Sequence, residues 1–261
     1  MNQYPENIIQ AIVLLLLGII AVAPVLLIIE VLDLNIPAAL LNQVLFVLVV
    51  VAIVAIYAKK QSYTFFFNGF WSKTTKLSTK TGYLLLLFLL IFQLGINLPF
   101  SKYLSFHIRD TANIANPLSN VSMLLGGLLL APFCEEIIFR GIILRGFLGT
   151  YSSGRAILYA TLIFSVIHVY PTLLFGALIL GMFLGYVFYL SKSMAYVIFF
   201  HALANFITSF DGYYLYSNYG EARVEAVYGS LSIWIVLIST IFCTGLTVSL
   251  LKRGSLKKDF H

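Results

Sequence analysis

Long apolar runs, separated by short polar stretches, follow one another along the chain. A helix needs about 20 apolar residues to cross the hydrocarbon core of a bilayer, and most of these runs approach or exceed that length. The pattern predicts an all-α fold, a polytopic transmembrane helix bundle of about eight spans. The expected spans are Ile8–Ile29, Ile36–Ala58, Tyr83–Phe100, Leu118–Arg145, Ile157–Tyr170, Thr172–Leu190, Met194–Phe210 and Ser230–Leu251.

The composition agrees with this prediction. Of the 261 residues, 61% are hydrophobic and only 10% are charged, whereas soluble domains average about 25% charged residues. This shortage of charge excludes a disordered chain and a nucleic-acid-binding domain, and it argues against a soluble enzyme. Without internal repeats or a linker-like segment, residues 1–261 are expected to form one membrane domain, whose motif-bearing core is 118–210.

The distribution of basic residues predicts the orientation of the bundle. With eight spans, the loops fall into two alternating sets and both termini lie on the same side. One set contains twelve of the sixteen Lys and Arg residues and the other contains three. Cytoplasmic loops carry the excess of positive charge, so both termini are expected in the cytoplasm of a multi-pass cell-membrane protein. The surrounding lipid bilayer, rather than a nucleic acid, is therefore the expected partner of this basic chain.

Three charged residues lie inside the fourth run, where charge is costly. The stretch contains Glu135, Glu136 and Arg140, and a single charge at the centre of a span costs about 2.5–3.5 kcal/mol on insertion scales. Glu136 and Arg140 are four residues apart, so they share a helix face and can neutralise each other. Glu135 points about 100° away from them and has no partner in its own helix. Glu135 is accordingly the stronger functional candidate.

Two later runs carry polar side chains at the same four-residue spacing. The fifth run contains Phe164 and His168, and the seventh contains His201 and Asn205. A single buried histidine is more often a packing residue, but here two of them accompany an intramembrane carboxylate. A shared polar pocket would satisfy all of these groups at once.

Glu, His, His and Asn together suit the hydrolysis of an amide bond. A carboxylate in an apolar pocket is a stronger base than one in water, and with an imidazole it can direct water at a carbonyl carbon. The remaining imidazole and amide can donate N–H groups to the oxyanion that forms. A second arrangement remains open, because Glu135, His168 and His201 also match the ligand set of a catalytic zinc ion.

The combination of motifs resembles the CAAX-protease and bacteriocin-processing family, also called the Abi family, which includes type II CAAX prenyl endopeptidases. Three motifs appear in the family's order on separate apolar runs. They are Glu135-Glu136-x-x-x-Arg140, Phe164-x-x-x-His168 and His201-x-x-x-Asn205.

This resemblance implies an eight-helix bundle and assigns roles to the motif residues. Glu135 would be the base that activates water, with His168 beside it, and His201 with Asn205 would bind the oxyanion. Family members are described both as glutamate-dependent and as metal-dependent, so the zinc alternative remains open. The resemblance implies supporting roles for Glu136 and Arg140, which would hold the site together, and for Phe164 of the second motif.

The expected function is an intramembrane endopeptidase that acts on a membrane-associated peptide or protein. Its chemistry would be either CAAX-protease-like or peptide and bacteriocin processing. The short chain with compact loops is typical of bacterial members, so a bacterial plasma membrane is expected. The alternative is a non-catalytic membrane regulator or immunity protein that binds a partner helix. A transporter that uses Glu135 and His168 as a proton relay is a third hypothesis.

Overall fold

The computed structural model describes residues 4–32, 38–61, 77–100, 125–168, 171–219 and 228–255. Within these ranges all regular elements are helices and there is no strand, which confirms the all-α prediction. The elements are α1 (Ile8–Val31), α2 (Ala38–Gln61), α3 (Thr79–Phe92), η1 (Gln93–Asn97), η3 (Gly126–Leu130), α6 (Ala131–Glu136), η4 (Ile137–Leu144), α7 (Arg145–Thr150), α8 (Ser153–Val166), α9 (Pro171–Ser191), α10 (Met194–Tyr219), η5 (Gly229–Leu231) and α12 (Ser232–Ser255).

Five of the described helices are long and apolar enough to cross a membrane. They are α1, α2, the continuous α3–η1 helix, α9 and α12. Helix α8 and the first part of α10 are shorter apolar helices. The fourth expected span corresponds to four consecutive helical elements from η3 to α7, and its first residues, 118–124, lie outside the described ranges. The protein is therefore a multi-pass membrane helix bundle.

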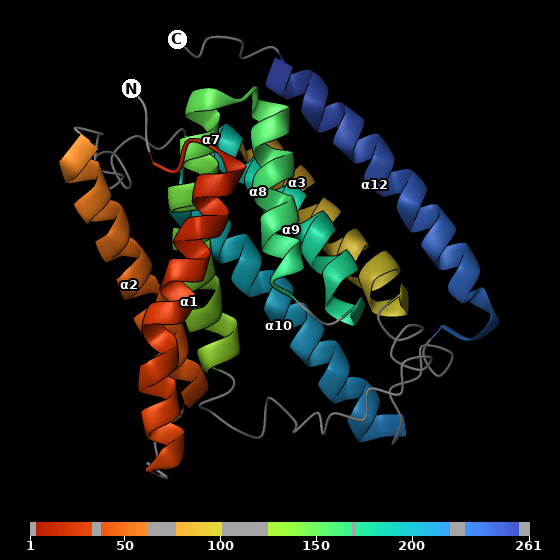
Figure 1. Cartoon of the computed structure of the whole chain (residues 1–261). Coiled ribbons are helices and arrows are strands. Elements are labelled where there is room, and N and C mark those ends of the chain that lie inside the picture. Colours follow the sequence, from red (N-terminus) through yellow and green to blue (C-terminus); the bar gives the residue numbers. More distant parts are fainter. Residues whose placement is uncertain are drawn as a thin grey trace.

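A central group of helices lies between a pair of helices on one side and a single helix on the other. Helices α1 and α2 run along one side of the bundle, α12 runs along the opposite side, and α8, α9 and α10 lie between them (Figure 1). Half of the membrane-spanning window of α9 is buried inside the protein, compared with 11% of that of α12. Helix α12 therefore presents most of its apolar side chains to lipid, while α9 belongs to the core.

The two ends of the described chain lie at the same end of the bundle. Helix α1 begins there and α12 ends there (Figure 1), as an even number of spans requires. The assignment of this end to the cytoplasm remains a prediction, since many of the basic loop residues lie outside the described ranges.

The helix that carries the acidic motif departs from regular α-helical geometry. Its π-helical segments η3 and η4 flank the short helix α6, and the backbone N–H of Ala131 donates to the carbonyl of Gly126, five residues earlier. Pro132 stands at the start of α6. A proline ring clashes with the carbonyl four residues before it, and a wider turn relieves that clash. Glu135 and Glu136 thus lie between the two widened segments, and Arg140 lies within η4.

Candidate active site

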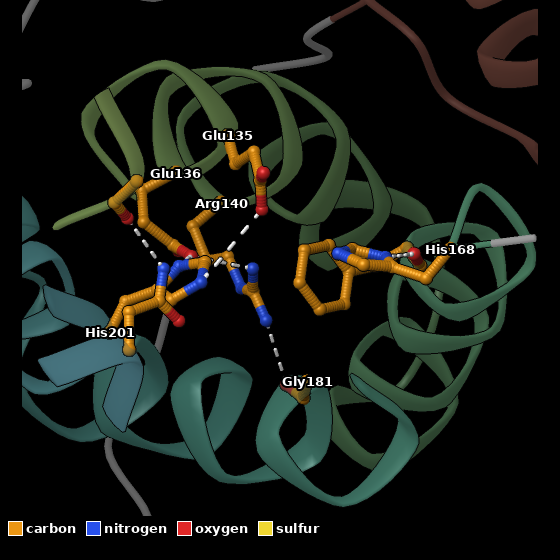
Figure 2. A network of polar contacts seen from close by, with 9 residues as sticks. Glu135, Glu136, Arg140, His168, Gly181 and His201 are labelled. Atoms are coloured by element: carbon orange, nitrogen blue, oxygen red, sulfur yellow. Dashed lines mark hydrogen bonds and ion pairs between the residues drawn. The ribbon is translucent and has the colours of Figure 1, made fainter. Parts of the chain in front are cut away.

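Glu136 is the centre of a buried polar network. One of its oxygens, Oε1, accepts hydrogen bonds from Arg140 Nη1 at 2.8 Å and from His201 Nδ1 at 2.6 Å (Figure 2). The side chain is fully buried. Because Arg140 already donates to this oxygen, the carboxylate acts as an acceptor and His201 carries a hydrogen on Nδ1. Glu136 therefore fixes the orientation of the His201 ring, besides pairing with Arg140 as its spacing predicts.

Arg140 connects the acidic motif to two other helices. Its Nη2 donates to the backbone carbonyl of Gly181 on α9 at 3.0 Å, and its guanidinium lies over the ring of Phe164 on α8, 4.6 Å from the centroid. Charge-assisted hydrogen bonds of this kind are among the stronger ones in proteins. Arg140 thus compensates for its own burial with three kinds of contact.

The approach of α8 to α9 at this point depends on glycine. A Cβ atom added at Gly181 would lie 3.0 Å from Thr161 Cγ2 and 3.1 Å from Phe164 Cδ1, and one added at Gly185 would lie 2.9 Å from Ile157 Cγ2. Small residues spaced four apart let two membrane helices pack closely. This close packing brings the Gly181 carbonyl and the Phe164 ring to the same guanidinium.

Glu135 lies next to this network without joining its hydrogen bonds. Its Oε2 is 3.8 Å from His201 Nε2, beyond hydrogen-bond distance. Oε2 is itself buried and has no hydrogen-bond partner among the described residues. The Glu135 side chain is 28% exposed, compared with 0% for Glu136. Of the two adjacent carboxylates, Glu135 is therefore the one that a substrate or a water molecule can reach.

His168 lies in the turn that follows α8, on the other side of Glu135 from His201 (Figure 2). Its Nδ1 is 2.8 Å from the carbonyl oxygen of Phe164, and its ring packs against the Phe164 ring, with centroids 4.7 Å apart. A carbonyl only accepts, so Nδ1 carries the hydrogen and Nε2 of the neutral ring is a proton acceptor. His168 is near enough to Glu135 to interact with it electrostatically, although the two are not hydrogen-bonded.

Asn205 lies one turn after His201 on α10, on the same helix face. Its side-chain Nδ2 donates to the backbone carbonyl of Gly127 in η3 at 2.9 Å. His201 and Asn205, the expected oxyanion pair, therefore lie on one helix. His201 is hydrogen-bonded to Glu136 and Asn205 to Gly127, both on the helix that carries the acidic motif.

Two amide residues of the third span belong to the same neighbourhood, and the sequence reading did not identify them. Gln93 is buried, its Nε2 donates to the Ala204 carbonyl at 3.4 Å, and its Oε1 accepts from Asn97 Nδ2 at 2.7 Å. These contacts brace the turn of α10 that carries the histidine and asparagine. The available signal was the four-residue spacing of Gln93 and Asn97, which is the same as in the three recognised motifs.

The described side chains do not form a metal-ligand cluster. Among the residues that the structure describes, no three His, Cys, Asp or Glu side chains are grouped closely enough to hold a metal ion. The Nδ1 atoms of His168 and His201 are engaged by the Phe164 carbonyl and by Glu136. These bonds leave Nε2 of each imidazole available, as in zinc-bound histidines. It is the lack of grouping of Glu135, His168 and His201 in this structure, and not their hydrogen bonds, that does not fit the three-ligand zinc site.

Comparison with known proteins supports the resemblance that the motifs indicate. Residues 117–207 match the family model described as "Type II CAAX prenyl endopeptidase Rce1-like". The matched segment is about a third of the chain and contains every residue of the site built above except Gln93 and Asn97. No curated protein and no solved structure gives a match.

Proposed function

From the match of residues 117–207 to a family of CAAX-protease-like membrane peptidases, we propose that this protein is an intramembrane endopeptidase. It hydrolyses a peptide bond of a membrane-associated peptide or protein. The observation that carries the proposal is an accessible intramembrane carboxylate, Glu135, between two imidazoles whose Nδ1 atoms are both engaged.

Glu135 serves as the general base. Its side chain is partly exposed, whereas that of Glu136 is fully buried. Its Oε2 is itself buried and has no hydrogen-bond partner among the described residues, so it is an acceptor that a bound water can satisfy. His168 supports the same water through its Nε2. In the reaction, the water oxygen bonds to the carbonyl carbon of the substrate and its proton passes to Glu135. That proton is then delivered to the leaving amine as the C–N bond breaks.

The charges of the site favour this transfer. Donation from His201 Nε2 to the oxyanion, while Nδ1 donates to Glu136, requires a hydrogen on both ring nitrogens. In that form the two carboxylates, Glu135 and Glu136, lie beside two cations, Arg140 and His201. When Glu135 takes the proton, the negative charge moves from its carboxylate to the oxyanion of the substrate. The net charge of the site stays unchanged, so no new charge has to be accommodated in a low-dielectric environment.

His201 and Asn205 stabilise the oxyanion. Glu136 and Arg140 keep His201 oriented through its Nδ1, so its Nε2 faces the side of the ring where Glu135 lies. Asn205 contributes a side-chain N–H from the next turn of α10. Removing one such donor from known enzymes lowers kcat by about 10²–10³-fold.

The substrate we propose is a short peptide matured at the membrane. The description of the matching family names prenylated CAAX proteins as another substrate class. The bacterial origin that the sequence predicts would favour peptide or bacteriocin processing instead. Purified protein incubated with one quenched fluorogenic peptide, with and without a farnesyl group, distinguishes the two classes. Cleavage that requires the farnesyl group would contradict the assignment to peptide maturation.

The decisive experiment compares the membrane peptides of cells that express the wild-type protein, Glu135→Gln or Glu30→Gln. Glu30 is an exposed carboxylate at the end of α1, which contributes no group to the site. Mass spectrometry should find a set of cleavage products with the wild type and with E30Q, and none with E135Q. An unchanged product set with folded, inserted E135Q would contradict the proposal and favour the non-catalytic regulator. Proton-driven solute flux without peptide products would favour the transporter.

A further inference from the structure

The backbone carbonyl of Gly127 has no donor within its own helix. Ala131 N–H is bonded to Gly126 in the i→i+5 pattern of η3, so it is not available to Gly127. Continuing the pattern, the next donor would be the nitrogen of residue 132. Residue 132 is proline, which has no N–H. Pro132 therefore ends the π-helical pattern and leaves one carbonyl without a partner along the chain.

Asn205 supplies the missing donor from α10. Its Nδ2 lies 2.9 Å from the Gly127 carbonyl oxygen, and Gly127 is itself exposed on the surface of the bundle. A backbone group that faces the membrane without a partner is costly, which is why neighbouring helices compensate for prolines in membrane spans. Because a carbonyl only accepts, this contact also determines which end of the Asn205 amide faces Gly127.

We infer that Pro132 is a positioning residue for Asn205. Because proline has no backbone N–H, the Gly127 carbonyl stays unbonded within its own helix and accepts the hydrogen bond of the Asn205 side chain. One hydrogen of the amide nitrogen is engaged by Gly127, and the second remains available to the substrate one helical turn from His201. The inference rests on the proposed function, since it explains how the second oxyanion donor is oriented. It also gives a reason for a proline three residues before the base Glu135.

The test combines Pro132→Ala and Asn205→Ala in the full-length protein. In P132A the segment gains an N–H, and the Gly127 carbonyl can be satisfied by residue 132 in the π pattern or by residue 131 in an α-helix. Asn205→Ala should therefore lower the apparent Tm by about 2–4 °C in the wild-type background and by much less in P132A. Pro24→Ala, which removes the proline inside α1, is the matched control, and in it Asn205→Ala should have its full effect.

Cleavage provides the second readout, followed as the Glu135-dependent peptide products. P132A should reduce their formation by about tenfold to a hundredfold, because the donor loses its orientation, and P24A should not. Equal effects of Asn205→Ala on Tm in the wild-type and P132A backgrounds would overturn the inference, as would wild-type cleavage by P132A. An unaltered product set with E135Q marks failure of the proposed function itself, whereas the Tm comparison tests the hydrogen bond without any substrate.

Discussion

Replacement of Glu136 by glutamine should destabilise the folded protein strongly, because it removes one partner of a buried ion pair. The variant leaves Arg140, whose side chain is only 2% exposed, without its carboxylate partner. Removing one partner from a buried ion pair costs about 3–5 kcal/mol. Here Arg140 keeps the Gly181 carbonyl and its position over the Phe164 ring, and a desolvated cation–π contact is worth about 2 kcal/mol. We therefore expect the lower end of the range, about 3 kcal/mol.

At about 2–4 °C per kcal/mol, this loss corresponds to a fall of about 6–12 °C in apparent Tm. The measurement is thermal unfolding of the full-length protein in nanodiscs. The matched control is Glu30→Gln, which neutralises an exposed carboxylate on α1 and should leave the Tm unchanged.

A second variant separates the unpaired charge from simple loss of packing. In E136Q combined with Arg140→Met, no buried charge is left unpaired, and replacing both partners of a buried pair is often nearly neutral. Most of the lost Tm should therefore return. The reasoning is refuted if E136Q unfolds within 2 °C or so of the wild type, or if the double variant is as unstable as E136Q alone.

Four further predictions follow from the described contacts. Gly181→Ala should destabilise the fold by about 1–3 kcal/mol, since its new Cβ would lie 3.0 Å from α8, whereas Gly149→Ala, with nothing within 4 Å, should be neutral in the same unfolding assay. His168→Ala should reduce product formation by about 10²–10⁴-fold at nearly unchanged Tm; substantial remaining cleavage would remove His168 from the mechanism. Burial and the positive charge of Arg145 lower the pKa of Lys192, in the loop after α9, below its ordinary 10.5. Just below pH 10.5 the unfolded chain therefore binds more protons than the folded protein, so Tm should rise with pH there. Lys192→Gln should flatten that rise. Chelators should leave cleavage unchanged, because the candidate ligands are not grouped; activity that is lost on chelation and restored by zinc would contradict this.

Hydrophobicity located the spans well but not all of their ends. Helix α8 ends at Val166, before the expected Tyr170, and α10 continues beyond the expected Phe210 to Tyr219. Hydropathy marks where side chains are apolar, while a helix continues wherever its backbone hydrogen bonds can form. The boundaries therefore differ even though each of the eight expected runs contains a described helix.

The sequence predicts those contacts of the candidate site whose two groups lie one helical turn apart. The pair Glu136–Arg140 has that spacing, and the structure joins the two at 2.8 Å. The additional contact of Glu136 with His201 crosses between helices and has no sequence signature. The same holds for the backbone acceptors at Gly127 and Gly181, because a carbonyl becomes available only through local geometry and packing.

The four-residue spacing of Glu136 and Arg140 also matters for the biosynthesis of the protein. A membrane protein acquires its spans in sequence order, and each enters lipid before its later neighbours exist. Because this ion pair lies within one helix, the acidic segment can enter the bilayer with two of its three charges already matched. The contact with His201 has to wait until α10 has been inserted. Under the proposed mechanism, the nascent chain carries the base Glu135 without the oxyanion donors of α10, so proteolytic activity is expected only after the bundle has assembled.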